Sequence, residues 1–129
     1  MEVLPKIWTY SELSAEFPSE QRIELINNRL FMPPAPSPEH QIISKKTFKE
    51  LDGFVENKQL GQTFYAPIDV ILDEYTVVQP DILFISNARL KHLTKRGFEG
   101  VPDLVVEIIS PSTFYRDSHE KFGLYERVG

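Results

Sequence analysis

The stretch from Asp103 to Ser112 constrains the fold more than any other part of the chain. Its sequence, Asp-Leu-Val-Val-Glu-Ile-Ile-Ser-Pro-Ser, places one acidic residue, Glu107, inside a run of apolar residues. Such a run predicts a central strand that is buried on both faces. Burial of a carboxylate costs free energy unless a partner compensates its charge. The sequence therefore predicts that Glu107 binds a divalent ion inside the fold, together with other carboxylates.

The length and composition of the chain indicate one domain with a substantial core. The chain has 129 residues, of which 41% are hydrophobic and 26% are charged, as in ordinary globular proteins. Cysteine is absent, which excludes disulfides, thiolate metal sites and thiol nucleophiles. The first residues lack the pattern of a signal peptide, and no apolar run approaches the roughly 20 residues that span a bilayer. We therefore expect a cytoplasmic protein without a membrane segment.

The net charge of −5 counts mildly against a nucleic-acid-binding protein. Two clusters of basic residues soften this expectation. They consist of Lys45, Lys46 and Lys49, and of Arg89, Lys91, Lys95 and Arg96. Solvated side chains on a surface face explain such clusters as well, because runs of charge are common on protein surfaces.

The first third of the chain predicts a short helix and a hairpin. Thr9 and Glu12 have the spacing of a capping box, which predicts a helix over residues 9–17. The alternating pattern over residues 22–32 is interrupted by Asn27-Asn28. Asparagine tolerates positive φ angles, so this pair predicts a two-residue hairpin turn of a primed type.

A long helix should follow. Ser37 and Pro38 have the pattern of an N-cap with proline at the first helical position, which predicts a helix from there to about Asn57. Its expected buried face, at spacings of three and four, consists of Ile43, Thr47, Phe48, Leu51, Phe54 and Val55. His40 lies in the first turn, where a histidine is more often a surface or capping residue than a ligand.

The remainder of the chain predicts a sheet and a closing helix. Strands are expected over residues 62–65, 69–72 and 77–85, followed by a polar, irregular stretch over residues 90–100. Pro80-Asp81 interrupts the third of these strands, and bulges of this kind often lie beside active sites. A helix should begin at about Ser112 and still be in progress at the end of the sequence. The order of elements is that of an α+β or α/β arrangement around a mixed sheet.

Three acidic residues, Glu24, Asp81 and Glu107, fall on strand-like segments. Carboxylates on neighbouring strands converge, because strands lie about 4.8 Å apart. At such separations they repel unless a cation lies between them or one stays protonated. Mg²⁺ suits such a site, because it takes one or two carboxylates and keeps several waters. The pattern is weak by itself, since in a chain with 19 acidic residues positions in turns or surface ion pairs explain it as well.

Several motifs taken together resemble one bacterial family. They are Glu24-Leu25-Ile26, Pro36-Ser37-Pro38-Glu39-His40-Gln41, Val78-Gln79-Pro80-Asp81, Pro102-Asp103-Leu104-Val105-Val106-Glu107-Ile108 and Ser110-Pro111-Ser112-Thr113. From about residue 9 to residue 129 the chain is similar to bacterial restriction-endonuclease-like proteins long catalogued as a domain of unknown function. The placement of Asp81 and Glu107 resembles that of the acidic residues in the PD-(D/E)xK nuclease superfamily.

The resemblance implies a fold, a site and a substrate. The fold would be α/β (α+β), with a restriction-endonuclease-like mixed β-sheet flanked by helices. Asp81 and Glu107 would bind Mg²⁺ or Mn²⁺, and Glu24 would be a further acidic member of the site. For a nuclease of this kind, His40 is a candidate for contact with the metal ligands. The substrate would be DNA. A homodimer is expected by analogy, because two active sites cut two strands and two-fold dimers are the commonest oligomers.

The chain departs from the superfamily pattern at the second position after Glu107, which holds Ile109 where a lysine belongs. In this family the lysine has moved to the next helix, and Lys121 is the candidate here for a catalytic role. An i,i+4 ion pair with Asp117 is the alternative role for Lys121. The family also continues beyond the end of this sequence, which implies a single domain over residues 1–129 that is truncated at its C-terminal end or completed by a partner.

Three functional hypotheses follow. The first is a metal-dependent endonuclease that uses Asp81, Glu107, Glu24 and Lys121. The second is a catalytically inactive, nuclease-like module that works through protein or nucleic-acid binding, which the acidic net charge and the displaced lysine favour. The third is another carboxylate-pair hydrolase, such as a glycosidase, for which only Asp81 and Glu107 speak.

Overall fold

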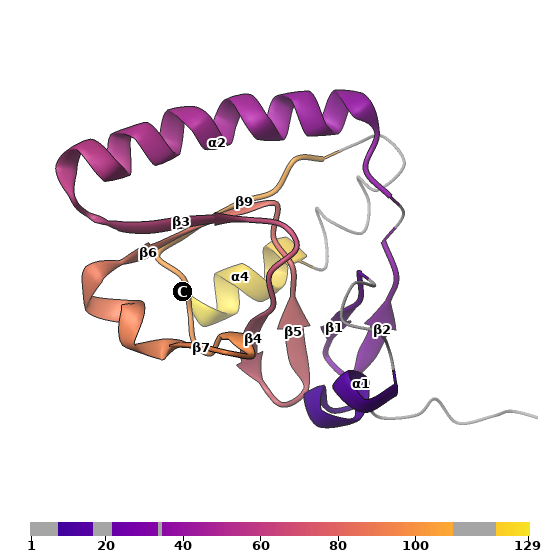
Figure 1. Cartoon of the computed structure of the whole chain (residues 1–129). Helices are drawn as coiled ribbons and strands as arrows, with labels where there is room; N and C mark the ends of the chain where they lie inside the picture. Colours follow the sequence, from indigo (N-terminus) through magenta and orange to yellow (C-terminus); the bar gives the residue numbers. More distant parts are fainter. Residues whose placement is uncertain (1–7, 17–21, 34, 110–120) are drawn as a thin grey trace, which may run out of the picture.

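Two β-sheets and the helices that cover them make up the part of the chain that the computed structural model describes, residues 8–16, 22–33, 35–109 and 121–129 (Figure 1). The larger sheet has the order β2-β1-β5-β4-β8-β7, and the smaller sheet has the order β3-β6-β9. The strands are β1 Glu24–Ile26, β2 Arg29–Phe31, β3 Gly61–Tyr65, β4 Val70–Asp73, β5 Thr76–Val78, β6 Ile82–Ser86, β7 Leu93–Thr94, β8 Gly97–Phe98 and β9 Leu104–Val106. The helices are α1 Tyr10–Glu16, α2 Pro38–Lys58, the 3₁₀-helix η1 Asn87–His92 and α4 Phe122–Val128. No helix in these described ranges is long and apolar enough to cross a membrane.

The helix and hairpin predicted for the first third of the chain are confirmed. The backbone N–H of Glu12 donates to the hydroxyl of Thr9 at the start of α1, as a capping residue requires. The turn between β1 and β2 has Asn27 at φ 51° and Asn28 at φ 67°, which identifies a type I′ turn. Its register places Leu25 opposite Leu30. On its other edge β1 pairs with β5, so this hairpin forms one end of the larger sheet.

The smaller sheet carries the strand that the sequence predicts to be central. β6 pairs antiparallel with β3 on one side and with β9 on the other. Within the described residues β9 is therefore an edge strand, and Leu104 is 44% exposed. The prediction of a central strand buried on both faces around Glu107 is wrong. The central position belongs to β6, in which Ile82, Leu83 and Ile85 are fully buried.

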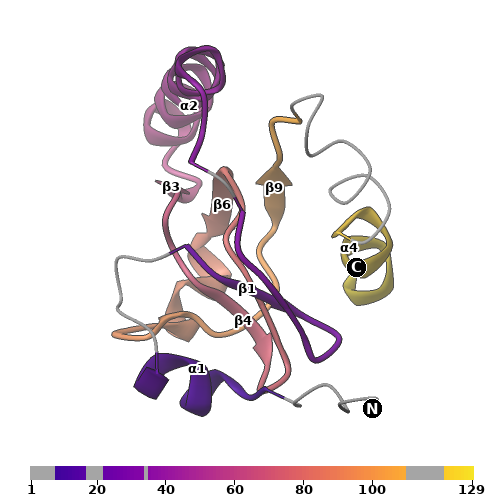
Figure 2. The ribbon, with the colours of Figure 1, turned by 90° about the vertical axis from the view of Figure 1, so that its right-hand side faces the viewer.

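Helices lie on the two sides of the smaller sheet, with α2 along one face and α4 on the other (Figures 1 and 2). The main core fills the space between the two sheets and α4. It consists of Ile26, Val70, Val78, Leu83, Ile85, Phe98 and Leu124. A second cluster, Tyr10, Leu25, Ile71 and Val77, joins α1 to the other face of the larger sheet. The mixed sheet flanked by helices that the resemblance implies is therefore present.

The long helix α2 is confirmed, but its predicted buried face is only partly covered. The hydroxyl of Ser37 accepts from the backbone N–H of His40, which caps the helix. Val55 is the buried residue of the helix, whereas Ile43 and Phe54 remain 44% and 54% exposed. The reason is geometric, since α2 packs chiefly along the single strand β3 and one strand cannot cover a wide apolar stripe.

The stretch over residues 90–100 is more regular than predicted. It contains the end of η1 and a small hairpin made of β7 and β8. Gly97, at φ 140°, permits this hairpin, because a Cβ there would collide with the backbone carbonyl of Asp69. The N–H of Phe98 donates to that carbonyl oxygen at 2.9 Å, so the close approach joins β8 to β4. The predicted end of the first helix at Phe17 and the predicted helix start at Ser112 lie outside the described residues.

Candidate active site

Asp81 and Glu107 lie side by side at the ends of two paired strands. The antiparallel register of β6 and β9 places Ile82 opposite Val106, and its continuation by one residue places Asp81 opposite Glu107. The backbone N–H of Ile108 donates to Asp81 Oδ2 at 2.7 Å, which fixes this end of the ladder. Asp81 is 6% exposed. The break at Pro80 thus separates β5 from β6 and puts a buried carboxylate beside Glu107.

Glu24 and Lys121 complete the cluster from opposite ends of the chain. The ammonium of Lys121, just before α4, lies 2.7 Å from Glu24 Oε2 and 2.9 Å from Glu107 Oε1. Glu24 on β1 also accepts from the backbone N–H of Gln79 at 2.7 Å. Both Glu24 and Lys121 are buried, at 3% and 4% exposure. The predicted partner of Lys121 in the alternative reading, Asp117, lies outside the described residues.

Two further side chains hold the carboxylates. His40 Nε2, in the first turn of α2, lies 3.3 Å from Asp81 Oδ1, so His40 belongs to the cluster rather than to the open surface. The hydroxyl of Tyr125 donates to Glu107 Oε1 at 2.9 Å. Sequence reasoning missed Tyr125 and the backbone contact of Gln79. The spacing of four residues between Lys121 and Tyr125 was the available signal, because residues at i and i+4 share a helix face.

The environment shifts the titration of the buried groups. Burial raises the pKa of Glu107 to about 7 against the pull of the Lys121 ammonium, and the charges of Glu24 and Asp81 raise it further. Burial by itself would lower the pKa of Lys121, but Glu24 and Glu107 outweigh it and the pKa is raised. Lys121 is thus a permanent cation at neutral pH, while Glu107 can gain or lose a proton there.

Asp81 and Glu107 have the chemistry of ligands for a divalent ion. Asp81 and Glu107 lie close enough for the charge of Asp81 to raise the pKa of Glu107. One or two carboxylates with water ligands are a donor set that Mg²⁺ and Mn²⁺ accept, so this pair fits. Glu24 and Glu107 both bind the Lys121 ammonium, and Glu24 also accepts from the backbone N–H of Gln79. Accordingly, no three acidic or histidine side chains form a ready metal site anywhere in the described ranges.

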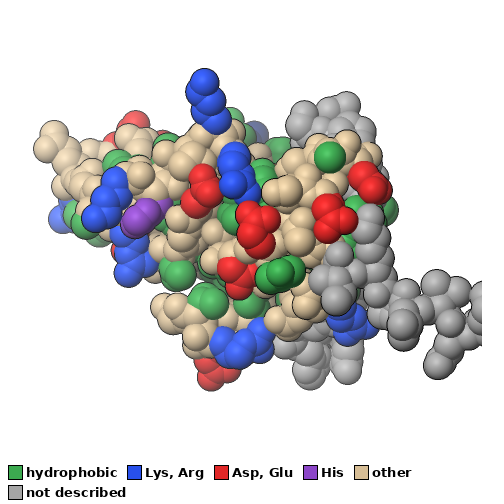
Figure 3. Space-filling view, turned by 90° about the horizontal axis from the view of Figure 1, so that it is seen from below, with side chains coloured by type: hydrophobic (Ala, Val, Ile, Leu, Met, Phe, Trp, Pro, Cys, Tyr) green, Lys and Arg blue, Asp and Glu red, His purple; other side chains and the backbone are tan. Residues whose placement is uncertain are grey.

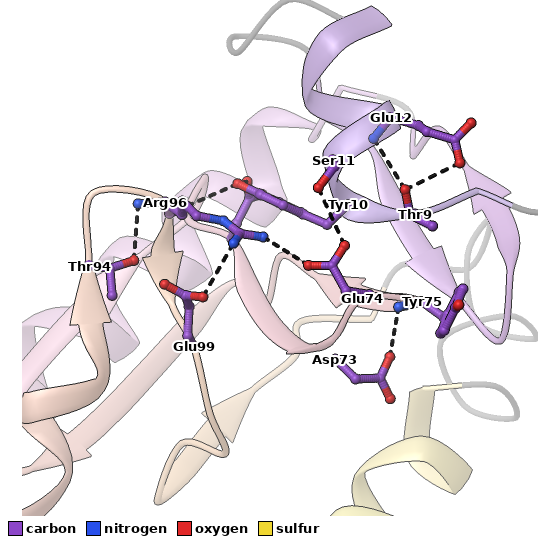
Figure 4. A network of polar contacts seen from close by, with 11 residues as sticks. Thr9, Tyr10, Ser11, Glu12, Asp73, Glu74, Tyr75, Thr94, Arg96 and Glu99 are labelled. Atoms are coloured by element: carbon purple, nitrogen blue, oxygen red, sulfur yellow. Dashed lines mark hydrogen bonds and ion pairs between the residues drawn. The ribbon is translucent and has the colours of Figure 1, made fainter.

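A second polar network contacts the carboxylate cluster through Gln79. The side-chain amide of Gln79 donates to Asp69 Oδ1 at 2.9 Å, and the hydroxyl of Tyr10 donates to Asp69 Oδ2 at 3.1 Å. The guanidinium of Arg96 lies 4.3 Å from the centre of the Tyr10 ring, and Glu74 and Glu99 pair with Arg96 (Figure 4). Gln79 therefore links this network to Glu24 and fixes the segment between β5 and β6.

Comparison with known proteins places these features in a wider group. Residues 8–129 match the model of the Uma2 family, which is described as "Putative restriction endonuclease". Among solved structures, the chain is similar to a crystal structure of a "putative nuclease belonging to DUF820" from Anabaena variabilis, with a TM-score of 0.78 and 19% sequence identity. The similarity covers 94% of this chain and 69% of that chain, and at this identity it shows the fold alone. No match was found among curated proteins.

Proposed function

The chain belongs to the Uma2 family of restriction-endonuclease-like proteins, and from this premise we propose that it is a metal-dependent nuclease that hydrolyses phosphodiester bonds in DNA. One observation carries the proposal. Two carboxylates at the ends of paired strands, Asp81 just before β6 and Glu107 just after β9, lie in one buried cluster with a lysine ammonium. A cluster of buried charges costs free energy to maintain, so a function is a better explanation for it than stability.

In this proposal Asp81 and Glu107 hold Mg²⁺ or Mn²⁺. A divalent ion bound there would stabilise the negative charge that develops on the phosphate and lower the pKa of a water molecule. His40 keeps Asp81 oriented through its contact with Oδ1, and the N–H of Ile108 fixes Oδ2. Residues that orient ligands in this way commonly matter for both metal affinity and activity.

Lys121 supplies the second positive charge of the proposed site. Its ammonium, held by Glu24 and Glu107, would donate a hydrogen bond to the attacking water or to a phosphate oxygen. Such a fixed donor is most effective in a site from which bulk water is excluded. Glu24, the further acidic member of the site, then acts as a positioning residue for Lys121.

The direct test measures cleavage of plasmid DNA with Mg²⁺ or Mn²⁺ by the wild type, Asp81→Asn and Glu107→Gln. Loss of about 100-fold or more in each variant is expected, as for removal of a metal ligand. Glu50→Gln is the matched control, because Glu50 is an exposed carboxylate on α2. Cleavage that survives in both site variants contradicts the proposal.

A second function has one observation in its favour. Lys121 already pairs with both Glu24 and Glu107, so each of these glutamates has a cationic partner without a metal ion. A nuclease-like module that acts through protein or nucleic-acid binding would need no more than this. Such a module would bind neither Mg²⁺ nor Mn²⁺ at millimolar concentration. A homodimer is compatible with either function, and size-exclusion chromatography would detect it.

A further inference from the structure

A groove of about 840 Å³ opens beside the candidate active site, between the first turns of α2 and the residues that follow β3. Asp81 and His40 line it and also belong to the carboxylate cluster. A molecule in the groove therefore lies next to Asp81. The remaining walls combine cationic and aromatic side chains, among them Arg22, Lys45 and Tyr65.

Tyr65 presents an aromatic ring at the mouth of this groove. The ring is part of a side chain that is 64% exposed. Phe48 of α2 holds it in an edge-to-face contact, with centroids 4.9 Å apart and an interplanar angle of 75°. The next residue, Ala66, donates its N–H to the carbonyl of Asp81 at 3.0 Å. The exposed ring of Tyr65 thus belongs to the residue just before Ala66, whose N–H binds the backbone carbonyl of Asp81.

Two cations line the same groove. The Nε of Arg22 is buried and makes no hydrogen bond to any part of the chain that the structure describes. Lys45 of α2 is exposed and reaches the groove from the helix side. Positive side chains next to an aromatic ring are the combination with which proteins bind single-stranded nucleic acid, because phosphates pair with the cations and bases stack on the ring.

The same features disfavour a base-paired helix as the occupant of the groove. Paired bases are stacked on one another and offer no free face to Tyr65, and a volume of about 840 Å³ is that of a small-molecule site. A protein that binds duplex DNA relies on many phosphate contacts, whereas this chain has a net charge of −5. On the face turned away from α2, acidic side chains lie across the centre and basic side chains lie mainly around them, so the described residues form no continuous basic patch on this face (Figure 3).

We propose that this groove binds a single-stranded segment of DNA, with a base stacked on Tyr65 and backbone phosphates on Arg22 and Lys45. This inference rests on the proposed nuclease function and names the form of its substrate. An unpaired strand seated there places a phosphate next to Asp81, so the preferred substrates carry unpaired ends, flaps or gaps.

The test measures binding by fluorescence anisotropy in EDTA, so that no cleavage occurs. The probes are a labelled single strand of about 12 nucleotides, within the site sizes of single-strand-binding folds, a blunt duplex of the same sequence, and an abasic strand of the same length. The wild type should bind the single strand about tenfold or more tightly than the other two. Equal binding of the blunt duplex or of the abasic strand overturns the inference.

Variants identify the surface. Tyr65→Ala should weaken binding of the normal strand about tenfold, Tyr65→Phe should retain binding, and Tyr75→Ala is the control because Tyr75 is an exposed tyrosine away from the groove. Lys45→Gln should reduce the slope of log affinity against log salt by about 0.7. Lys46→Gln, at a neighbouring position outside the groove, should leave the slope unchanged. The assignment of the groove is contradicted if Tyr65→Ala and Tyr75→Ala weaken binding equally. It is also contradicted if Lys45→Gln and Lys46→Gln change the salt slope equally.

The two proposals fail in different ways. Selective single-strand binding that depends on Tyr65, without metal-dependent cleavage of any DNA, refutes the nuclease function and leaves the groove assigned. The opposite result is metal-dependent cleavage that requires Asp81, is unaffected by Tyr65→Ala, and cuts blunt duplex as fast as overhanging ends. It refutes single-strand binding in the groove and leaves the nuclease function in place.

Discussion

Lys121 and Glu107 form an ion pair of 2.9 Å between the start of α4 and the end of β9. The lysine ammonium is 5% exposed and the carboxylate 16% exposed, so water screens the pair only weakly. The position two residues after Glu107, where the superfamily carries its lysine, is occupied by the exposed Ile109. Lys121, just before α4, thus provides the cation that pairs with the carboxylates.

Removal of this cation should destabilise the protein. Lys121→Met leaves Glu24 and Glu107 buried without their partner, and breaking a buried pair in this way costs about 3–5 kcal/mol. Urea denaturation monitored by circular dichroism measures the loss. Glu24→Gln added to Lys121→Met should recover part of the stability. A Lys121→Met protein as stable as the wild type would mean that the ammonium does not hold the carboxylates.

Glu107 should make the stability of the metal-free protein depend on pH. Its pKa rises from 4.5 to about 7 on folding, so the folded state holds a proton that the unfolded chain has released. The free energy of unfolding therefore decreases as the pH rises from about 4.5 to 7, by at most about 3 kcal/mol from this group. Denaturation in EDTA at several pH values tests this. Glu107→Gln should flatten the profile, whereas the exposed control Glu50→Gln should keep it.

The hydroxyl of Tyr125 should lower the pKa of Glu107. Its hydroxyl donates to Glu107 Oε1, and a donor to a carboxylate favours the charged form. Tyr125→Phe should cost about 0.5–1.5 kcal/mol of stability and move the pH dependence of Glu107 upward. The pH profile of unfolding in EDTA detects this shift. An unchanged profile would indicate that the hydroxyl is not bonded to Glu107 in solution.

His40 should act on catalysis through Asp81. His40→Ala removes the contact to Asp81 Oδ1, and loss of a residue that orients a metal ligand typically costs about 10–100-fold in metal affinity or activity. Rates of DNA cleavage and Mn²⁺ affinity should fall together, while His40→Gln should retain part of both. Full activity in His40→Ala would mean that the contact of His40 with Asp81 does not orient the carboxylate for catalysis.

The sequence predicts the elements of this site better than their surroundings. The turn at Asn27-Asn28 and the break at Pro80 follow from local backbone preferences, which place Glu24 on β1 and Asp81 just before β6. Lys121 came from a family resemblance, since no local pattern connects residue 121 with residue 24. Tyr125 and the backbone N–H of Gln79 were missed, because contacts between distant segments depend on how the elements pack.

Errors on the fold have the same origin. An apolar run predicts that a strand prefers burial, but it does not say which neighbours cover it. β9 is accordingly an edge strand within the described residues, although its sequence resembles that of a central strand. For the same reason the periodic face of α2 was predicted to be buried, while Phe54 remains 54% exposed.

The most direct measurement of the central claim is calorimetric titration of the full chain with Mn²⁺, with Asp81→Ala alongside. Mn²⁺ should bind the wild type and the control Glu50→Gln, and this binding should disappear in Asp81→Ala. Circular dichroism of each variant verifies that the fold is retained. Absence of binding in the wild type, or equal binding in Asp81→Ala, would contradict a metal site at Asp81 and Glu107 and would favour the nuclease-like binding module.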